Sequence, residues 1–142
     1  MTLRCATEAD AEVVAELSAQ LDYPVEVEVV RSRLKQFAAN PEHSVLVAEH
    51  HGHVCGWVHA HVQQSLVGGA RGEILGLVVA REVRRAGIGR LLMQEAERWV
   101  CDRGLDMMVL RSNVKRPESH TFYPALGYEH FRTQAAYRKR VR

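Results

Sequence analysis

A short loop rich in glycine and arginine separates a strand pattern from a helical pattern near the middle of the chain. The strand pattern is the apolar run from Ile74 to Val79, and the helical pattern begins at about Ile88. Between and just beyond them lie Arg84, Arg85, Ala86, Gly87, Ile88, Gly89 and Arg90. Glycines let a ligand approach the backbone closely, and the first N–H groups of a helix have no partner within it. Together with the helix dipole and the arginines, they predict a binding site for an anion such as a phosphate group.

Two familiar phosphate-binding loops do not fit this segment. No Gly-Lys-Ser/Thr sequence follows the glycines, as a Walker loop requires, and the glycine spacing differs from the Gly-x-Gly-x-x-Gly fingerprint of dinucleotide-binding folds. The pattern is short, and an ordinary strand-to-helix turn with solvated arginines also satisfies it. The loop by itself therefore leaves both interpretations open.

Three longer segments extend this loop into a pattern that covers nearly the whole chain. They are the run from Leu77 to Leu92, the pair Ser112-Asn113 followed by the segment from Phe122 to Tyr128, and the opening from Leu3 to Asp10. In this order they resemble the central motif, the late motif and the first strand and turn of the GNAT superfamily of acetyl-CoA-dependent N-acetyltransferases. We therefore interpret the chain as similar to a small, single-domain, bacterial-type member of that family.

Length and composition agree with one globular domain, which we place at residues 1–142. The chain has 46% hydrophobic and 25% charged residues, and its net charge of +2 is too small to indicate a nucleic-acid partner. No apolar run approaches the roughly 20 residues that span a bilayer, and no signal peptide is evident. The three cysteines at 5, 55 and 101 are few and widely spaced, as in reduced proteins. We expect a cytoplasmic protein without a membrane association.

Hydrophobic periodicity and turn residues predict a mixed succession of helices and strands. Helices are expected after Thr7 to Asp10, over 27–37, from 88 to before Gly104, and from Pro117 to Gly127. Strands are expected at the N-terminus and over 45–49, 55–62, 74–79, 107–110, 128–132 and 135–139. The resemblance implies the GNAT fold within the α/β class: a central mixed, mostly antiparallel sheet, splayed in its middle and flanked by about four helices.

Two residues are candidates for acid–base chemistry, because attack of an amine on a thioester releases a proton and expels a thiolate. Glu73 lies just before the central strand, where glutamate-using members of the family have their base. Burial that raised its pKa would suit that role, although Glu73 could instead anchor a cationic substrate or merely begin a strand. Tyr123 matches the family's acid, because a phenol is protonated at neutral pH. The alternative for Tyr123 is an aromatic side chain that only packs.

The resemblance also implies how a cofactor is held. The backbone of the central strand would pair with the pantetheine amides as an added half-strand does, and one N–H, that of Val79, would polarise the thioester carbonyl. The implied cofactor-binding residues are Leu77, Val78, Val79, Arg84, Arg85, Ala86, Gly87, Ile88, Gly89, Arg90, Asn113 and Tyr123. Asn113 could equally be a turn residue that ends a strand.

Eight histidines raise the question of a metal site. His59 and His61 alternate along one strand, but no cysteine or acidic partner stands at a recognised metal-binding spacing. We predict no metal. The two histidines either lie on an ordinary strand surface or line the pocket of the acceptor, and with Glu73 they are the candidate substrate-binding residues.

These observations favour an acyltransferase that moves an acetyl group from acetyl-CoA directly to a primary amine of a small molecule. The first alternative is a protein lysine or N-terminal acetyltransferase, which differs only in its acceptor. The second is an acyl-CoA-binding module without catalysis. From the resemblance we also expect a homodimer, because the alternation from Ala135 to Val141 suits an edge strand.

Overall fold

The computed structural model describes residues 1–84, 86–112 and 117–142. Their contacts divide the chain into two units, residues 1–111 and residues 112–142. This division does not test the prediction that residues 1–142 act as one domain, which stays a prediction. No helix in the described part of the chain is long and apolar enough to cross a membrane.

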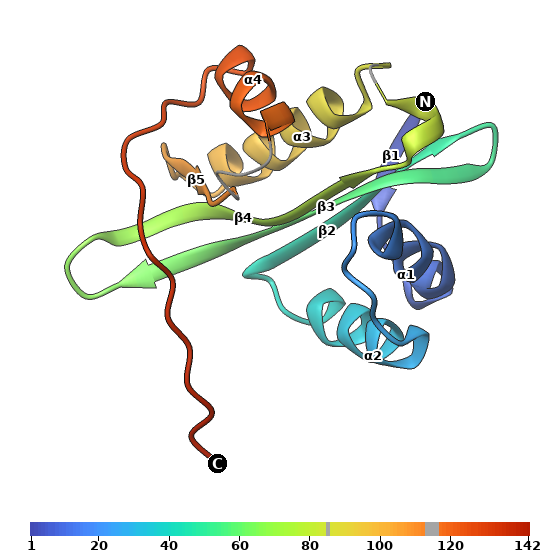
Figure 1. The fold of residues 1–142 in the computed structure, drawn as a ribbon, viewed down its shortest axis with the longest axis horizontal. Coiled ribbons are helices and arrows are strands. Elements are labelled where there is room, and N and C mark those ends of the chain that lie inside the picture. The colour runs from blue at the N-terminus through green and yellow to red at the C-terminus, as the bar shows by residue number, and fades with distance from the viewer. Residues whose placement is uncertain (85, 113–116) are drawn as a thin grey trace. The chain divides into compact units, whose positions relative to one another are not determined.

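A sheet of five strands forms the centre of the first unit, as far as the described residues go (Figure 1). The strands are β1 (Thr2–Cys5), β2 (His43–His50), β3 (His53–Ser65), β4 (Gly69–Val79) and β5 (Met108–Leu110). They lie side by side in chain order; the first three pairs are antiparallel, and β4 and β5 are parallel. The predicted mixed, mostly antiparallel sheet is confirmed.

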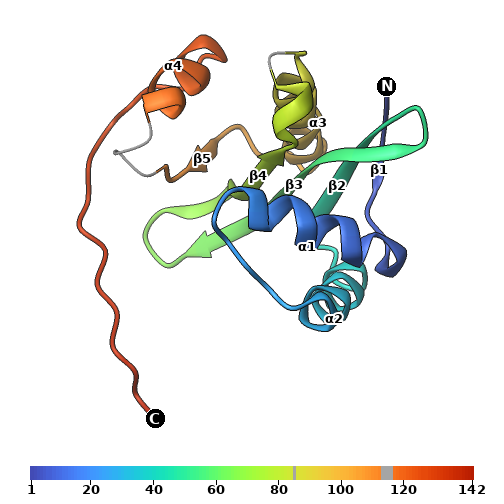
Figure 2. The same ribbon diagram turned by 45° about the vertical axis from the view of Figure 1, so that its right-hand side comes forward.

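Helices cover both faces of this sheet. Helices α1 (Ala11–Gln20) and α2 (Val27–Ala38) lie on one face and α3 (Ile88–Asp102) lies on the other (Figures 1 and 2). Two short 3₁₀ turns connect these elements. η1 (Glu8–Asp10) precedes α1, and η2 (Arg81–Val83) precedes the loop before α3. The buried stripe of α3 consists of Ile88, Leu92, Met93, Ala96 and Val100. Helical spacing places these residues on one side of the helix, against the sheet. Leu91, which is also apolar, is exposed and lies outside this stripe.

A β-bulge in β4 changes which side chains face α3. His59 pairs with Gly76 and Ala60 pairs with Ile74, so Leu75 has no partner on β3. The extra residue places Gly76 on the same face as Glu73, although the two are three residues apart. A Cβ atom on Gly76 would lie 2.7 Å from the ring of Trp57, so only glycine fits under this ring.

The sheet opens between β4 and β5. β5 pairs with β4 only from Gly72 to Ile74, whereas β3 follows β4 as far as Val79. Beyond Ile74 the second edge of β4 therefore has no strand partner among the described residues. This opening is the splay that the family resemblance implied.

The second unit contains α4 (Pro117–Ala125) and a C-terminal segment. Gly127 follows the helix with φ = +94°, as the predicted helix end requires. The two strands predicted at 128–132 and 135–139 are wrong, because residues 128–142 have no regular secondary structure. Alternating side chains suit a strand, but a strand also needs a partner edge for its backbone N–H and C=O groups.

Candidate active site

The loop before α3 has the geometry of an anion site. Gly87 is the N-cap of α3 and adopts φ = +82°, a left-handed conformation that favours glycine. No side chain caps this end of the helix, and no acidic residue lies in its first turn. Ala86, Gly87 and the side chains of Arg84 and Arg90 are exposed. Unpaired N–H groups and cationic side chains therefore face solvent together, while Arg85 lies outside the described residues.

The open edge of β4 runs directly toward this loop. Residues 77–79 continue the strand past the last residue that pairs with β5, and η2 then connects β4 to the loop. An exposed strand edge offers N–H and C=O groups to an extended, amide-bearing ligand. A strand edge followed by an anion site fits the pantetheine arm and the pyrophosphate of coenzyme A, in that order.

Glu73 is buried at the start of the central part of β4, with only 4% of its surface exposed. Its carboxylate is engaged on both oxygens. His61 Nε2 donates to Oε1 at 2.8 Å from the neighbouring strand β3, and Arg111 Nη1 donates to Oε2 from the end of β5. The candidate base is therefore held between a histidine and an arginine.

These partners decide the protonation state of Glu73. Burial alone would raise the pKa of its carboxyl group, but the hydrogen bond from His61 and the charge and hydrogen bond of Arg111 outweigh burial, so that the pKa is lowered. A pKa raised by burial, which would have suited a base, is therefore not found, because the two donors outweigh the effect of burial. Glu73 is ionised at neutral pH.

His59 belongs to a second cluster beside Glu73 on the same face of the sheet. His43 Nδ1 and His59 Nε2 are 2.9 Å apart, and the Phe37 ring lies 4.4 Å from the His43 ring and 4.6 Å from the His59 ring. Burial, with the neighbouring His43 and His61, lowers the pKa of His59 to about 4; burial and His61 also lower the pKa of His43. Both rings are neutral at pH 7. The His43 ring also lies 5.1 Å from that of His59 and 5.2 Å from that of His61.

No group of three or more His, Cys, Asp or Glu side chains is arranged to hold a metal ion in the described parts of the chain. The histidines instead contact one another, Phe37 and Glu73.

Tyr123 lies in α4 of the second unit. Its ring contacts Phe122 and Tyr128 edge-on, at centroid distances of 5.0 and 6.1 Å, and its carbonyl oxygen accepts a hydrogen bond from the Tyr128 N–H. Burial raises the pKa of the Tyr123 phenol above its usual value of 10. The hydroxyl is therefore protonated at neutral pH, as a proton donor must be. Asn113 lies outside the described residues.

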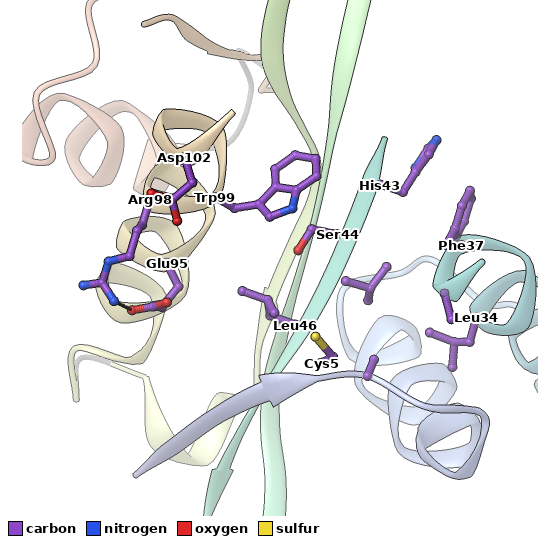
Figure 3. Close-up of a pocket in the computed structure, with 13 residues that line it drawn as sticks. Cys5, Leu34, Phe37, His43, Ser44, Leu46, Glu95, Arg98, Trp99 and Asp102 are labelled. Atoms are coloured by element: carbon purple, nitrogen blue, oxygen red, sulfur yellow. Dashed lines mark ion pairs between the residues drawn. The ribbon is translucent and has the colours of Figure 1, made fainter. Parts of the chain in front are cut away.

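A groove of about 360 Å³ lies between α2 and α3, beside the start of β2, where β1 does not reach along that strand (Figure 3). Phe37 and His43 line one side of it, and Glu95, Arg98 and Trp99 line the other. None of the predicted site residues lines this groove. It shares only Phe37 and His43 with the clusters around Glu73 and His59, so Glu73 rather than the groove remains the candidate centre of the chemistry.

Three residues of these clusters were not predicted from the sequence: Arg111, which contacts Glu73, and His43 and Phe37, which contact His59. Arg111 follows β5, and the parallel pairing of Val109 with Glu73 brings it to the carboxylate. His43 begins β2 opposite His61. In the sequence, Arg111 is simply a charged residue directly after a short apolar segment. That position indicates a contact with Glu73 only once it is known that β5 pairs with β4.

The sequence is similar to those of known acetyltransferases. The sequence model described as "Acetyltransferase (GNAT) family" matches residues 11–128. Over 102 residues the chain is 36% identical to the aminoalkylphosphonate N-acetyltransferase of Salmonella typhimurium, covering 68% of this chain and 66% of that relative.

Solved structures show the same fold. The apo aminoglycoside 6'-N-acetyltransferase AAC(6')-IG from Acinetobacter haemolyticus superposes with a TM-score of 0.85 over the full length of both chains, at 19% identity. AAC(6')-Iy in complex with a bisubstrate analog, CoA-S-monomethyl-acetylneamine, superposes with a TM-score of 0.87 over 98% of this chain and 97% of that one, at 20% identity. At these identities the likeness concerns the fold.

Proposed function

The chain belongs to the acetyltransferase (GNAT) family, and we propose that it transfers an acetyl group from acetyl-CoA directly to a primary amine of a small molecule. The observation that carries this proposal is the open edge of β4, which begins beside the buried Glu73 and leads into the uncapped N-terminus of α3. The similar enzyme of Salmonella typhimurium and the similar aminoglycoside enzymes, by their names, all acetylate amines of small molecules.

Coenzyme A binding is assigned to two adjoining parts of the chain. Leu77, Val78 and Val79 offer backbone groups to the pantetheine arm, and the N–H of Val79 polarises the carbonyl of the thioester. The loop and first turn of α3, with Arg84, Arg85, Ala86, Gly87, Ile88, Gly89 and Arg90, bind the pyrophosphate. Asn113 and Tyr123 complete the proposed cofactor site.

Two side chains handle the protons. Glu73 takes a proton from the acceptor's ammonium group, which leaves a neutral amine that can form a bond to the acetyl carbon. As the carbon–sulfur bond breaks, the Tyr123 phenol donates its proton to the departing sulfur, and the nitrogen, on becoming an amide, releases a second proton that restores the phenol. The ionised Glu73 and the protonated Tyr123 are each in the state that this direction of transfer needs. His59 and His61 line the acceptor side.

The protein is further proposed to act as a single domain, as a homodimer and in the cytoplasm. Cys5, Cys55 and Cys101 are free thiols, which suits a reducing compartment. The proposed homodimer rests on the family resemblance, since residues 128–142 form no strand in the described chain. Light scattering at working concentration tests the dimer, and a monomeric mass rejects it.

The decisive experiment measures thiol release from acetyl-CoA with a panel of small amines, with lysine-containing peptides and with no acceptor. Amine-dependent release, with a matching acetylated product by mass spectrometry, supports the proposal. Release only with peptides assigns a protein acetyltransferase. Calorimetric binding of acetyl-CoA without release with any acceptor assigns a binding module.

A further inference from the structure

A row of donors surrounds the buried carboxylate on the face of the sheet opposite α3. A Cβ atom on Gly72 would touch Val100 of α3, so its neighbours Arg71 and Glu73 point to the other face. On β3, Gln63 pairs with Arg71 and His61 pairs with Glu73. Arg111 joins them from the end of β5. We call Arg71, His61 and Arg111 the basic strip.

The basic strip and the Glu73 carboxylate together carry more positive than negative charge. Glu73 is the only carboxylate that the described residues of β3, β4 and β5 contribute, and both of its oxygens are already engaged. Arg111 balances the negative charge of Glu73. Arg71 is a further cation. Its Nε donates to Gln63 Oε1 at 2.8 Å, and the described contacts give it no acidic partner.

The two arginines remain open to a ligand. The Arg111 side chain is 67% exposed although it contacts Glu73, whose side chain is 6% exposed. The guanidinium therefore closes over the carboxylate and presents its outer side to solvent. Arg71 is half-buried, and Gln63 orients its guanidinium. A planar guanidinium that is held in place can bind a carboxylate, a phosphonate or a phosphate through two parallel hydrogen bonds.

We propose that the acceptor is an amphoteric small molecule, with an acidic group as well as its amine, and that Arg71 and Arg111 bind the acidic group. This inference rests on the proposed function and names the class of its acceptor. Successive residues on one face of a strand lie about 7 Å apart, so Arg71 and Glu73 suit an amine and an acid separated by a short carbon chain. A polycationic acceptor would be repelled, because it would face two arginine cations and only one carboxylate, whose charge Arg111 already balances.

The first test compares acceptors of similar length. The probes are 2-aminoethylphosphonate, β-alanine, n-propylamine and the polycation neamine, assayed by thiol release from acetyl-CoA. We expect kcat/KM for one of the two acidic amines to exceed that for propylamine and for neamine roughly tenfold or more, because a charged hydrogen-bonded pair is added. The ratio between phosphonate and carboxylate identifies the preferred acid. A value for propylamine or neamine equal to or above both acidic amines overturns the proposal.

The second test removes each arginine. Arg71→Gln and Arg111→Gln should each lower the preference for the acidic amine over propylamine roughly ten- to a hundredfold, mainly through KM. Arg98→Gln is the matched control, because Arg98 is 68% exposed and pairs with Glu95 on α3, on the other face of the sheet. Arg71 does not contact Glu73, so its variant tests the strip without disturbing the base. An unchanged preference in both variants overturns the proposal.

A binding measurement separates this inference from the proposed function. If no amine in the panel releases thiol, the proposed function fails. In that case 2-aminoethylphosphonate and β-alanine are each titrated into the protein by calorimetry, with coenzyme A present. Binding of either that weakens at least tenfold in Arg71→Gln supports the acidic-group site. Absence of binding by both, or equal binding by the variant, overturns it.

Discussion

His61 and Glu73 face each other across neighbouring strands, with His61 Nε2–H donating to Glu73 Oε1 at 2.8 Å. This contact places the candidate base inside a hydrogen-bonded network instead of leaving it as an isolated buried acid. Because Arg111 occupies the other oxygen, the carboxylate stays charged although it is buried. Burial of an unpaired carboxylate would have produced the opposite protonation state.

Glu73→Gln should lower kcat on the order of a hundred- to ten-thousandfold if Glu73 is the base. The pKa of Glu73 is lowered, so its basic form persists as the pH falls, and the acidic limb of kcat should lie below the usual glutamate value of 4.5. The pH profiles of wild type and variant check this. A wild-type limb near 6.5, in the ordinary range of a histidine, would assign the proton transfer to an imidazole.

Tyr123→Phe should lower kcat by a similar factor and leave the affinity for acetyl-CoA nearly unchanged. The lost proton matters only when the sulfur becomes negative, so the loss belongs to the transition state. The matched control is Tyr137→Phe, because Tyr137 is 94% exposed in the C-terminal segment. Single-turnover rates and calorimetric titration separate the two quantities, and full activity of Tyr123→Phe would leave this residue with a packing role.

Gly87→Ala should weaken acetyl-CoA binding roughly tenfold or more, because a methyl group would stand where the pyrophosphate approaches the backbone. Gly104→Ala is the control at the opposite end of α3. Gly87 and Gly104 have φ values of +82° and +77°, and a Cβ atom at either would meet no atom within 4 Å. Both variants should therefore lose a similar stability, on the order of 1 kcal/mol. Equal binding of acetyl-CoA by the two variants would contradict the proposed anion site.

Asp10→Asn should lower the free energy of unfolding at pH 7 by about 2 kcal/mol, because Asp10 is buried and accepts two hydrogen bonds from Arg4 at 2.8 Å. The Arg4 guanidinium holds the pKa of Asp10 below its usual value of 3.8. A lowered pKa stabilises the fold above the unfolded-state value and ceases to do so as the pH falls through the folded-state value.

The difference between wild type and Asp10→Asn should consequently shrink as the pH falls below about 4. Urea unfolding at several pH values measures it, with the exposed Asp106→Asn as the control. A difference that stays constant down to pH 3 would contradict the role of the ionised Asp10.

Local sequence patterns were sufficient to predict the helices and strands of the first unit. The apolar run of β4, the glycine at the start of α3 and the 3.6-residue spacing of that helix depend on neighbours in sequence, and each appears where it was predicted. The prediction of strands failed at residues 128–142. Their side chains alternate as in a strand, but these residues pair with no other strand in the described structure. Strand formation requires hydrogen bonds to a distant segment, which side-chain alternation does not encode.

The sequence by itself determined the family, the sheet class and the loop that is proposed to hold the cofactor. Only the tertiary structure decided the surroundings of Glu73, because His61 lies on β3, Arg71 on β4 and Arg111 directly after β5, and the register of these strands brings them together. The sign of the Glu73 pKa shift and the positive charge of the basic strip both follow from that arrangement. Electrostatic effects depend on distances between side chains, and a linear sequence does not contain the distances between strands that are far apart along it.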